Sequence, residues 1–165
     1  MNNSLNIKSS KKSPFNKSIL LGLICTFNLI GIVFTDVQVR AENASNYYEV
    51  GIEKLNQEDF SGATIAFEKT IEIDPNYPGA YFSLGLARES NNDKAGAIFA
   101  YTKALKNDPT NGLIYNNRAR SKYLSGDVRG SCIDLKRAVS VGNKESKVIL
   151  NGPIGSYVCS KAKEL

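Results

Sequence analysis

The sequence contains no histidine and no tryptophan, and only three of its 165 residues are cysteines. Without histidine, Ser-His-Asp and Cys-His catalytic centres and His-ligated metal sites are excluded. Three cysteines are too few for a four-cysteine zinc site, and too few for a small domain built on disulfides. We therefore expect no metal ion, no cofactor and no enzymatic activity.

The charge of the chain is unevenly distributed along the sequence. Apolar residues make up 42% and charged residues 22%, which is typical of one globular domain, and the net charge is +5. Residues 1–41 hold five bases and one acid, which leaves 16 bases and 15 acids in the rest of the chain. A nearly neutral domain lacks the basic surface that nucleic-acid binding requires, so we expect no nucleic-acid partner.

The N-terminal segment has the features of an export signal. Four lysines precede an apolar run at residues 19–34, and Val39-Arg40-Ala41 places small side chains before a cleavage site after residue 41. We predict that residues 1–41 are a signal peptide and that the mature chain is secreted or, in a bacterium, periplasmic. The alternative is an uncleaved N-terminal membrane anchor, which the 16-residue run disfavours because a spanning helix needs about 20 residues.

A 34-residue period runs through the remaining sequence. The positions that recur are aromatic, small or Asp-Pro: Tyr47, Tyr81 and Tyr115; Gly51 and Gly85; Ala63 and Ala97; Asp74-Pro75 and Asp108-Pro109. Within each unit the apolar residues have helical spacing, and the proline follows the second helix because it cannot continue it. The spacing predicts helices over 45–57, 59–73, 78–91, 94–107, 112–125 and 128–141.

This pattern resembles the tetratricopeptide repeat, whose signature is W-x2-L-G-x2-Y, then A-x3-F, then proline. In this sequence the second unit has Tyr81-x2-Leu84-Gly85, Ala97-x3-Tyr101 and Pro109. The resemblance covers about residues 44–143 and implies an all-α, right-handed solenoid of three helix-turn-helix units. We place these units at 44–77, 78–111 and 112–145.

The departures from the signature are also periodic. Tyrosine replaces tryptophan, and the second aromatic of the first helix is Lys54, Arg88 or Lys122. The third unit is degenerate, with Arg118-Ala119 in place of Leu-Gly. Glycine inside a helix costs about 1 kcal/mol, so we expect the recurring glycines to be offset by close packing against the recurring alanines of the second helix.

Residues 146–165 are predicted to form a capping segment that covers the apolar face of the last unit. Cys132 falls at the register of Ile98, which predicts a buried position, and Cys159 lies on the predicted capping helix. In an oxidising compartment we expect these two cysteines to form a disulfide, which would stabilise the fold by about 3 kcal/mol. The alternative is two buried thiols.

The resemblance implies that the chain binds a protein or peptide in a concave groove lined by the first helix of each unit. Carried over by register, the groove residues are Tyr48, Ile52, Leu55, Phe82, Leu86, Glu89, Asn116, Arg120 and Tyr123. The alternative is that the apolar members, Ile52, Leu55, Phe82 and Leu86, belong to the core. The predicted function is therefore that of a non-enzymatic exported adaptor.

A second hypothesis follows from the charges of the first and third units. Residues 44–77 have a net charge of −5 and residues 112–145 have a net charge of +4. Opposite charges at the two ends of an elongated domain favour head-to-tail association. The chain would then be a self-associating structural spacer at the cell envelope.

Overall fold

The computed structural model describes residues 38–162, so the predicted export segment up to residue 37 lies outside the described residues. Residues 39–165 form one compact unit, which contains the repeats. Residues 38–56 form a helix. The helices that follow are α2 (Phe60–Ile73), α3 (Ala80–Ser90), α4 (Lys94–Asn107), α5 (Gly112–Leu124), α6 (Val128–Ser140), α7 (Lys144–Asn151) and α8 (Pro153–Lys161).

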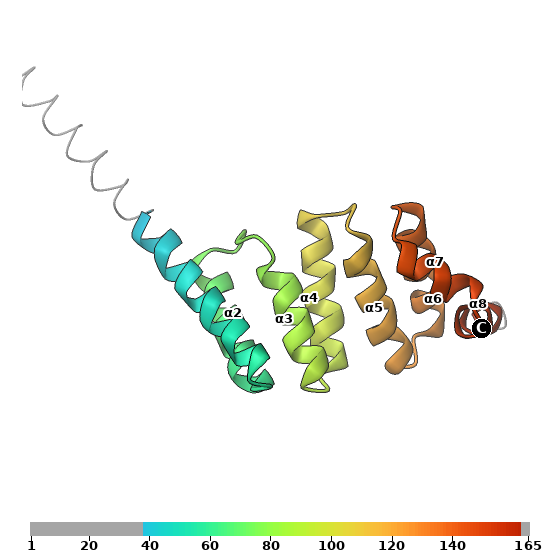
Figure 1. Cartoon of the computed structure of the whole chain (residues 1–165), viewed down its shortest axis with the longest axis horizontal. Helices are drawn as coiled ribbons and strands as arrows, with labels where there is room; N and C mark the ends of the chain where they lie inside the picture. The colour runs from blue at the N-terminus through green and yellow to red at the C-terminus, as the bar shows by residue number, and fades with distance from the viewer. Residues whose placement is uncertain (1–37, 163–165) are drawn as a thin grey trace, which may run out of the picture. The chain divides into compact units, whose positions relative to one another are not determined.

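The helices form three hairpins that follow one another in a row, with α7 and α8 after them (Figure 1). Each hairpin packs against the next, because α2 contacts α3 and α4 contacts α5. The observed helices agree with the predicted ones to within two residues, except that the first already includes residue 38. The predicted all-α helical-repeat fold is confirmed. No helix within residues 38–162 is long and apolar enough to cross a membrane.

An aspartate begins the second helix of every hairpin. The side chains of Asp59, Asp93 and Asp127 accept hydrogen bonds of 2.8–2.9 Å from the backbone N–H groups of the glycines three residues later. Such caps satisfy a free helix N–H and are each worth about 1 kcal/mol. The bond from Gly62, together with Lys54, holds the pKa of Asp59 below its usual value. The three caps share one register of the 34-residue period.

The recurring glycines make room for aromatic rings. A Cβ atom on Gly51 would lie 2.8 Å from Cζ of Phe67, and one on Gly85 would lie 2.9 Å from Cζ of Tyr101. Both rings are completely buried. The groups nearest to these glycines are the rings one helical turn beyond the recurring alanines, so it is the rings that require glycine at this register.

The last hairpin is covered by α7 and α8, which both contact α6. Val158 of α8 is buried. A disulfide joins Cys132 in α6 to Cys159 in α8, with the two Cα atoms 5.1 Å apart. The C-terminal cap is thus attached to the third hairpin by a covalent bond as well as by apolar contacts.

Candidate functional site

Four of the nine predicted groove residues pack against the core. Tyr48 and Leu55 pack against the apolar cluster that contains Phe67 and Leu84. Phe82 and Leu86 pack against the cluster that contains Tyr101 and Ile114. The alternative assignment to the core therefore describes the contacts of Leu55, Phe82 and Leu86.

Tyr48 and Ile52 line an open hollow beside the first hairpin, with a volume of about 470 Å³. The Tyr48 hydroxyl lies 3.1 Å from Oγ of Ser83, and its ring is 4.9 Å from that of Tyr77. Both contacts fix the ring in place. Glu49 and Glu53 also line the hollow, which makes it acidic. We call it the N-terminal hollow.

Glu89 and Arg120 pair with each other between α3 and α5. Nε and Nη2 of Arg120 donate to the two carboxylate oxygens of Glu89 over 2.7 and 3.0 Å. The Tyr101 hydroxyl donates to the same carboxylate over 2.9 Å. Burial, reinforced by Glu89, raises the pKa of Tyr101, so its phenol stays protonated. The bond to Glu89 also raises the pKa of Arg120.

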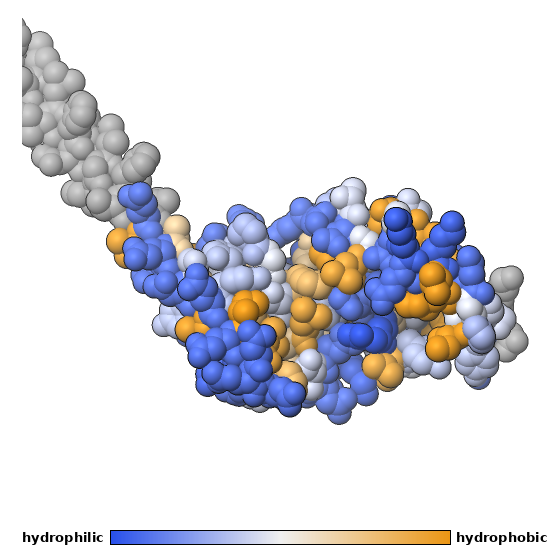
Figure 2. Space-filling view, in the orientation of Figure 1, coloured by the Kyte–Doolittle hydropathy of each residue, from blue (hydrophilic) through white to orange (hydrophobic). Residues whose placement is uncertain are grey.

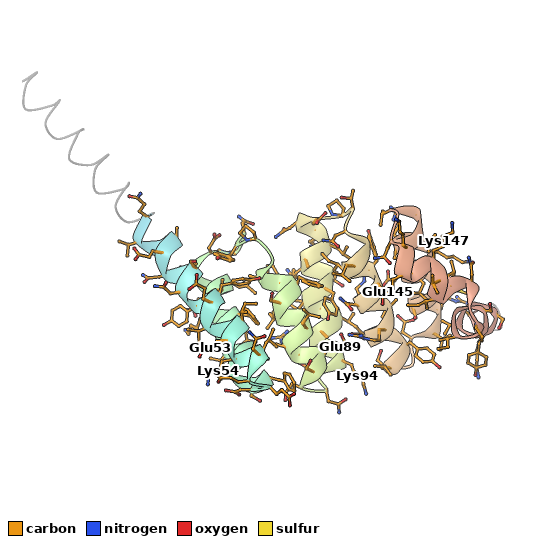
Figure 3. All side chains as sticks on the ribbon, viewed as in Figure 1. Glu53, Lys54, Glu89, Lys94, Glu145 and Lys147 are labelled. Atoms are coloured by element: carbon orange, nitrogen blue, oxygen red, sulfur yellow. A yellow bond between two sulfur atoms is a disulfide. The ribbon has the colours of Figure 1, made fainter. Side chains whose placement is uncertain are left out.

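Asn116, Arg120 and Tyr123 of α5 line a second hollow, with a volume of about 290 Å³. The other walls come from the last three helices: Ser131 and Leu135 of α6, Glu145 and Ile149 of α7, and Ile154 and Val158 of α8. Glu89 on α3 and Glu145 on α7 lie on the two sides of α5 (Figure 3). We call this cavity, which is mostly apolar with Arg120 and Glu145 in its wall, the C-terminal hollow.

The contribution of the cap to this hollow was not predicted from the sequence. The predicted groove used the first helices alone, whereas four of the eleven residues that line the C-terminal hollow come from α7 and α8. The available signal was the set of apolar residues in the capping segment, among them Val148, Ile149 and Ile154. Figure 2 shows apolar side chains at the surface around the C-terminal helices, and Ile154 is 67% exposed.

A buried ion cluster lies in the third hairpin. Arg118 donates to both carboxylate oxygens of Asp134 over 2.8 and 2.7 Å, and Nζ of Lys122 lies 2.9 Å from the same carboxylate. The Asp134 side chain is 3% exposed. The sequence showed Arg118 and Lys122 as departures from the repeat signature, but it did not reveal their shared partner. Among residues 38–162, no group of three His, Cys, Asp or Glu side chains has the geometry of a metal site.

The comparisons with known proteins agree with this architecture. The family model described as "Tetratricopeptide repeat" matches residues 78–111, the second predicted unit. No curated protein matches the chain. The second hairpin thus matches the model of the tetratricopeptide repeat, and the row of hairpins has the fold of solved tetratricopeptide-repeat domains.

Three solved structures illustrate the likeness. The first tetratricopeptide domain of human RPAP3 superimposes with a TM-score of 0.65 at 17% identity, covering 74% of this chain and 96% of that one. The TPR2B domain of yeast Sti1, in complex with pHsp70, gives 0.61 at 19% identity and covers 74% and 98%. The Yersinia enterocolitica secretion chaperone SycD, in complex with a YopD peptide, gives 0.58 at 14% identity and covers 73% and 89%. At these identities the likeness shows the fold.

Proposed function

We propose that this protein is a non-enzymatic, exported adaptor that binds a protein or peptide along the face formed by the first helices of its hairpins. The observation that carries the proposal is the C-terminal hollow. It combines apolar walls with Asn116, Arg120 and Glu145 in its lining. A hollow of this kind takes an apolar side chain of a partner, while the polar groups at its edge fix the orientation of the bound backbone.

The two hollows divide the proposed binding face into parts with different roles. The N-terminal hollow is open and acidic, with Glu49 and Glu53 in its lining. The C-terminal hollow is smaller and more apolar. In the wall of the C-terminal hollow the Arg120 guanidinium is already bonded to Glu89. We infer that the C-terminal hollow anchors the partner, and that the N-terminal hollow selects partners with a basic or neutral segment.

The solved relatives in complexes support a peptide as the class of partner. SycD is bound to a YopD peptide, and the Sti1 domain is in complex with pHsp70.

Site-specific photocrosslinking tests the proposal in the intact protein. A photoreactive amino acid is placed at Ile52, Asn116 or Tyr123 in the hollows, and at the exposed Ser61 of α2 as a matched control. Phe82 and Arg120 are unsuitable, because the first packs against the core and the second holds Glu89. We expect the hollow positions to capture the same partner in the native host and Ser61 to capture none.

Two outcomes would contradict the proposal. Equal capture from Ser61 and from the hollow positions would show that the crosslinks report random encounters. Adducts at twice the mass of the chain, formed from the hollow positions alone, would instead favour the self-associating spacer.

A further inference from the structure

Three large apolar side chains project into solvent from the second helices at the 34-residue period. Ile65 on α2, Phe99 on α4 and Ile133 on α6 are 62%, 54% and 59% exposed. Each lies two residues from buried positions such as Ala63 and Phe67, which places it on the opposite side of its helix. The three side chains therefore mark the outer faces of the hairpins, away from the proposed groove.

The outer faces of α4 and α6 are basic. They present Lys103, Lys106, Arg129, Lys136 and Arg137. The single carboxylate within these two helices, that of Asp134, is buried and paired with Arg118. The aspartates before the two helices, Asp93 and Asp127, are engaged as N-caps.

The outer face of α2 differs, which provides an internal comparison. It exposes Glu68 and Glu72 beside Ile65. Its cation, Lys69, is neutralised by Glu72 at 2.6 Å, and Glu68 is paired with Arg88 of α3 at 2.6 Å. The apolar residue is thus present on all three second helices, whereas the uncompensated positive charge is present on two.

Arg118 connects the basic faces of α4 and α6. From α5 it donates to Oγ1 of Thr102 on α4 over 3.0 Å and to Asp134 on α6. An open hollow of about 500 Å³ lies beside it, lined by Tyr115, Ile133, Lys136 and Arg137 among others. Because Arg118 and Lys122 share one carboxylate, this region keeps an excess of positive charge.

We propose that this basic outer face, formed by Phe99, Lys103, Ile133, Lys136 and Arg137, docks onto the surface of an anionic lipid bilayer. Phe99 and Ile133 enter the boundary between headgroups and acyl chains, and the cations meet lipid phosphates. The projection of Phe99 and Ile133 from the surface favours a bilayer over an acidic peptide as the partner. A fluid lipid interface closes around a projecting side chain, whereas a peptide needs a cleft to bind in. The hollow beside Ile133 is open and offers no such cleft.

The absence of tryptophan supplies a local reporter for the test. In the full chain, Ile133→Trp and Ile65→Trp each introduce a unique tryptophan at the same register of different hairpins. Both variants keep residues 19–34, so any insertion of that apolar run affects them equally. We expect Trp fluorescence at position 133 to shift to the blue, and to be quenched by brominated acyl chains, in vesicles containing phosphatidylglycerol but not in pure phosphatidylcholine. Trp at position 65 should change in neither.

Charge removal sharpens the test. In the Ile133→Trp background, Lys136→Gln with Arg137→Gln should weaken partitioning into phosphatidylglycerol vesicles by about 25-fold, at about fivefold for each cation. Lys69→Gln on the outer face of α2, where the charges are paired, is the matched control and should have no effect. Circular dichroism checks that each variant keeps its helices.

Three results would overturn the proposal. The first is equal quenching at positions 65 and 133, and the second is quenching at position 133 that does not depend on anionic lipid. The third is a fluorescence change at position 133 with polyglutamate but not with vesicles, which would assign the face to an acidic protein.

Discussion

The second and third hairpins have the same arrangement of helices but different interiors. In the second, Leu84 and Ala100 belong to one apolar cluster. At the same two registers the third hairpin has Arg118 and Asp134, which are joined by hydrogen bonds of 2.7 and 2.8 Å. The family model matches the second hairpin, residues 78–111.

Other positions change in a related way. Gly85 and Tyr101, which fit together in the second hairpin, correspond to Ala119 and Leu135 in the third. Ile98 corresponds to Cys132, which is bonded to Cys159 of the cap. The repeat geometry is thus kept by apolar fit in one hairpin, and by an ion cluster and a disulfide in the next. The comparison shows that a degenerate repeat can be compensated residue by residue.

The largest expected effect comes from removing the charge at the centre of the third hairpin. Asp134→Asn keeps the shape of the side chain but leaves Arg118 and Lys122, 15% and 18% exposed, without their carboxylate. We expect a loss of about 3–5 kcal/mol in the free energy of unfolding, because an uncompensated buried charge is costly. Urea denaturation followed by circular dichroism measures it.

The exposed cap residue Asp127 provides the control. Asp127→Asn keeps an oxygen for the N–H of Gly130 and should change stability by less than about 0.5 kcal/mol. A triple variant with Arg118→Leu, Lys122→Gln and Asp134→Ala moves the interior toward that of the second hairpin and should recover most of the loss. Equal effects of Asp134→Asn and Asp127→Asn would show that the cluster adds little to stability.

The fold could be predicted from the sequence because its signal is periodic. Helical spacing, the recurring aromatic positions and Pro75 and Pro109 located the helices to within two residues for all but the first. The periodic signal did not reveal which atoms meet across helices. The glycines face Phe67 and Tyr101, a contact set by side-chain size and direction that register alone does not specify.

The candidate site was less predictable than the fold. Register placed Asn116, Arg120 and Tyr123 on the face of α5 that lines the C-terminal hollow. It did not show that Arg120 is bonded to Glu89, or that Phe82 is held against Tyr101. Part of the other wall of the hollow comes from Ile149, Ile154 and Val158, which lie outside the repeat pattern. Pairwise contacts and non-repeating segments are not encoded by a 34-residue period.

An intermediate effect is expected from breaking the disulfide. Cys159→Ser removes the bond between α6 and α8, which spans a sequence separation of 27 residues, and should cost about 3 kcal/mol. Hydrogen exchange should accelerate in α8 and around the C-terminal hollow, while α3 and α4 keep their protection. Ser156→Ala on the exposed side of α8 is the control.

The regional pattern of exchange makes this prediction specific to the third hairpin. If Cys159→Ser accelerated exchange equally in α3 and α4, the disulfide would stabilise the whole domain. The second and third hairpins would then not differ in how they are stabilised. If reducing agent destabilised Cys159→Ser as much as the wild type, the loss would not come from this bond.

The smallest effect concerns the glycine of the second hairpin. Gly85→Ala adds a Cβ within 2.5 Å of Cδ1 of the buried Tyr101 ring, so the ring or the helix has to shift. We expect a net loss of about 1–2 kcal/mol in the free energy of unfolding, since overpacking costs about 1–3 kcal/mol and alanine regains part of this through its helix propensity.

The double variant Gly85→Ala with Tyr101→Leu reproduces the Ala119–Leu135 pair of the third hairpin. Thermal unfolding should show a smaller loss for the added methyl group in the Tyr101→Leu background than in the wild type, because the smaller side chain makes room for it. An equal loss in both backgrounds would mean that the ring is not what requires glycine at this register.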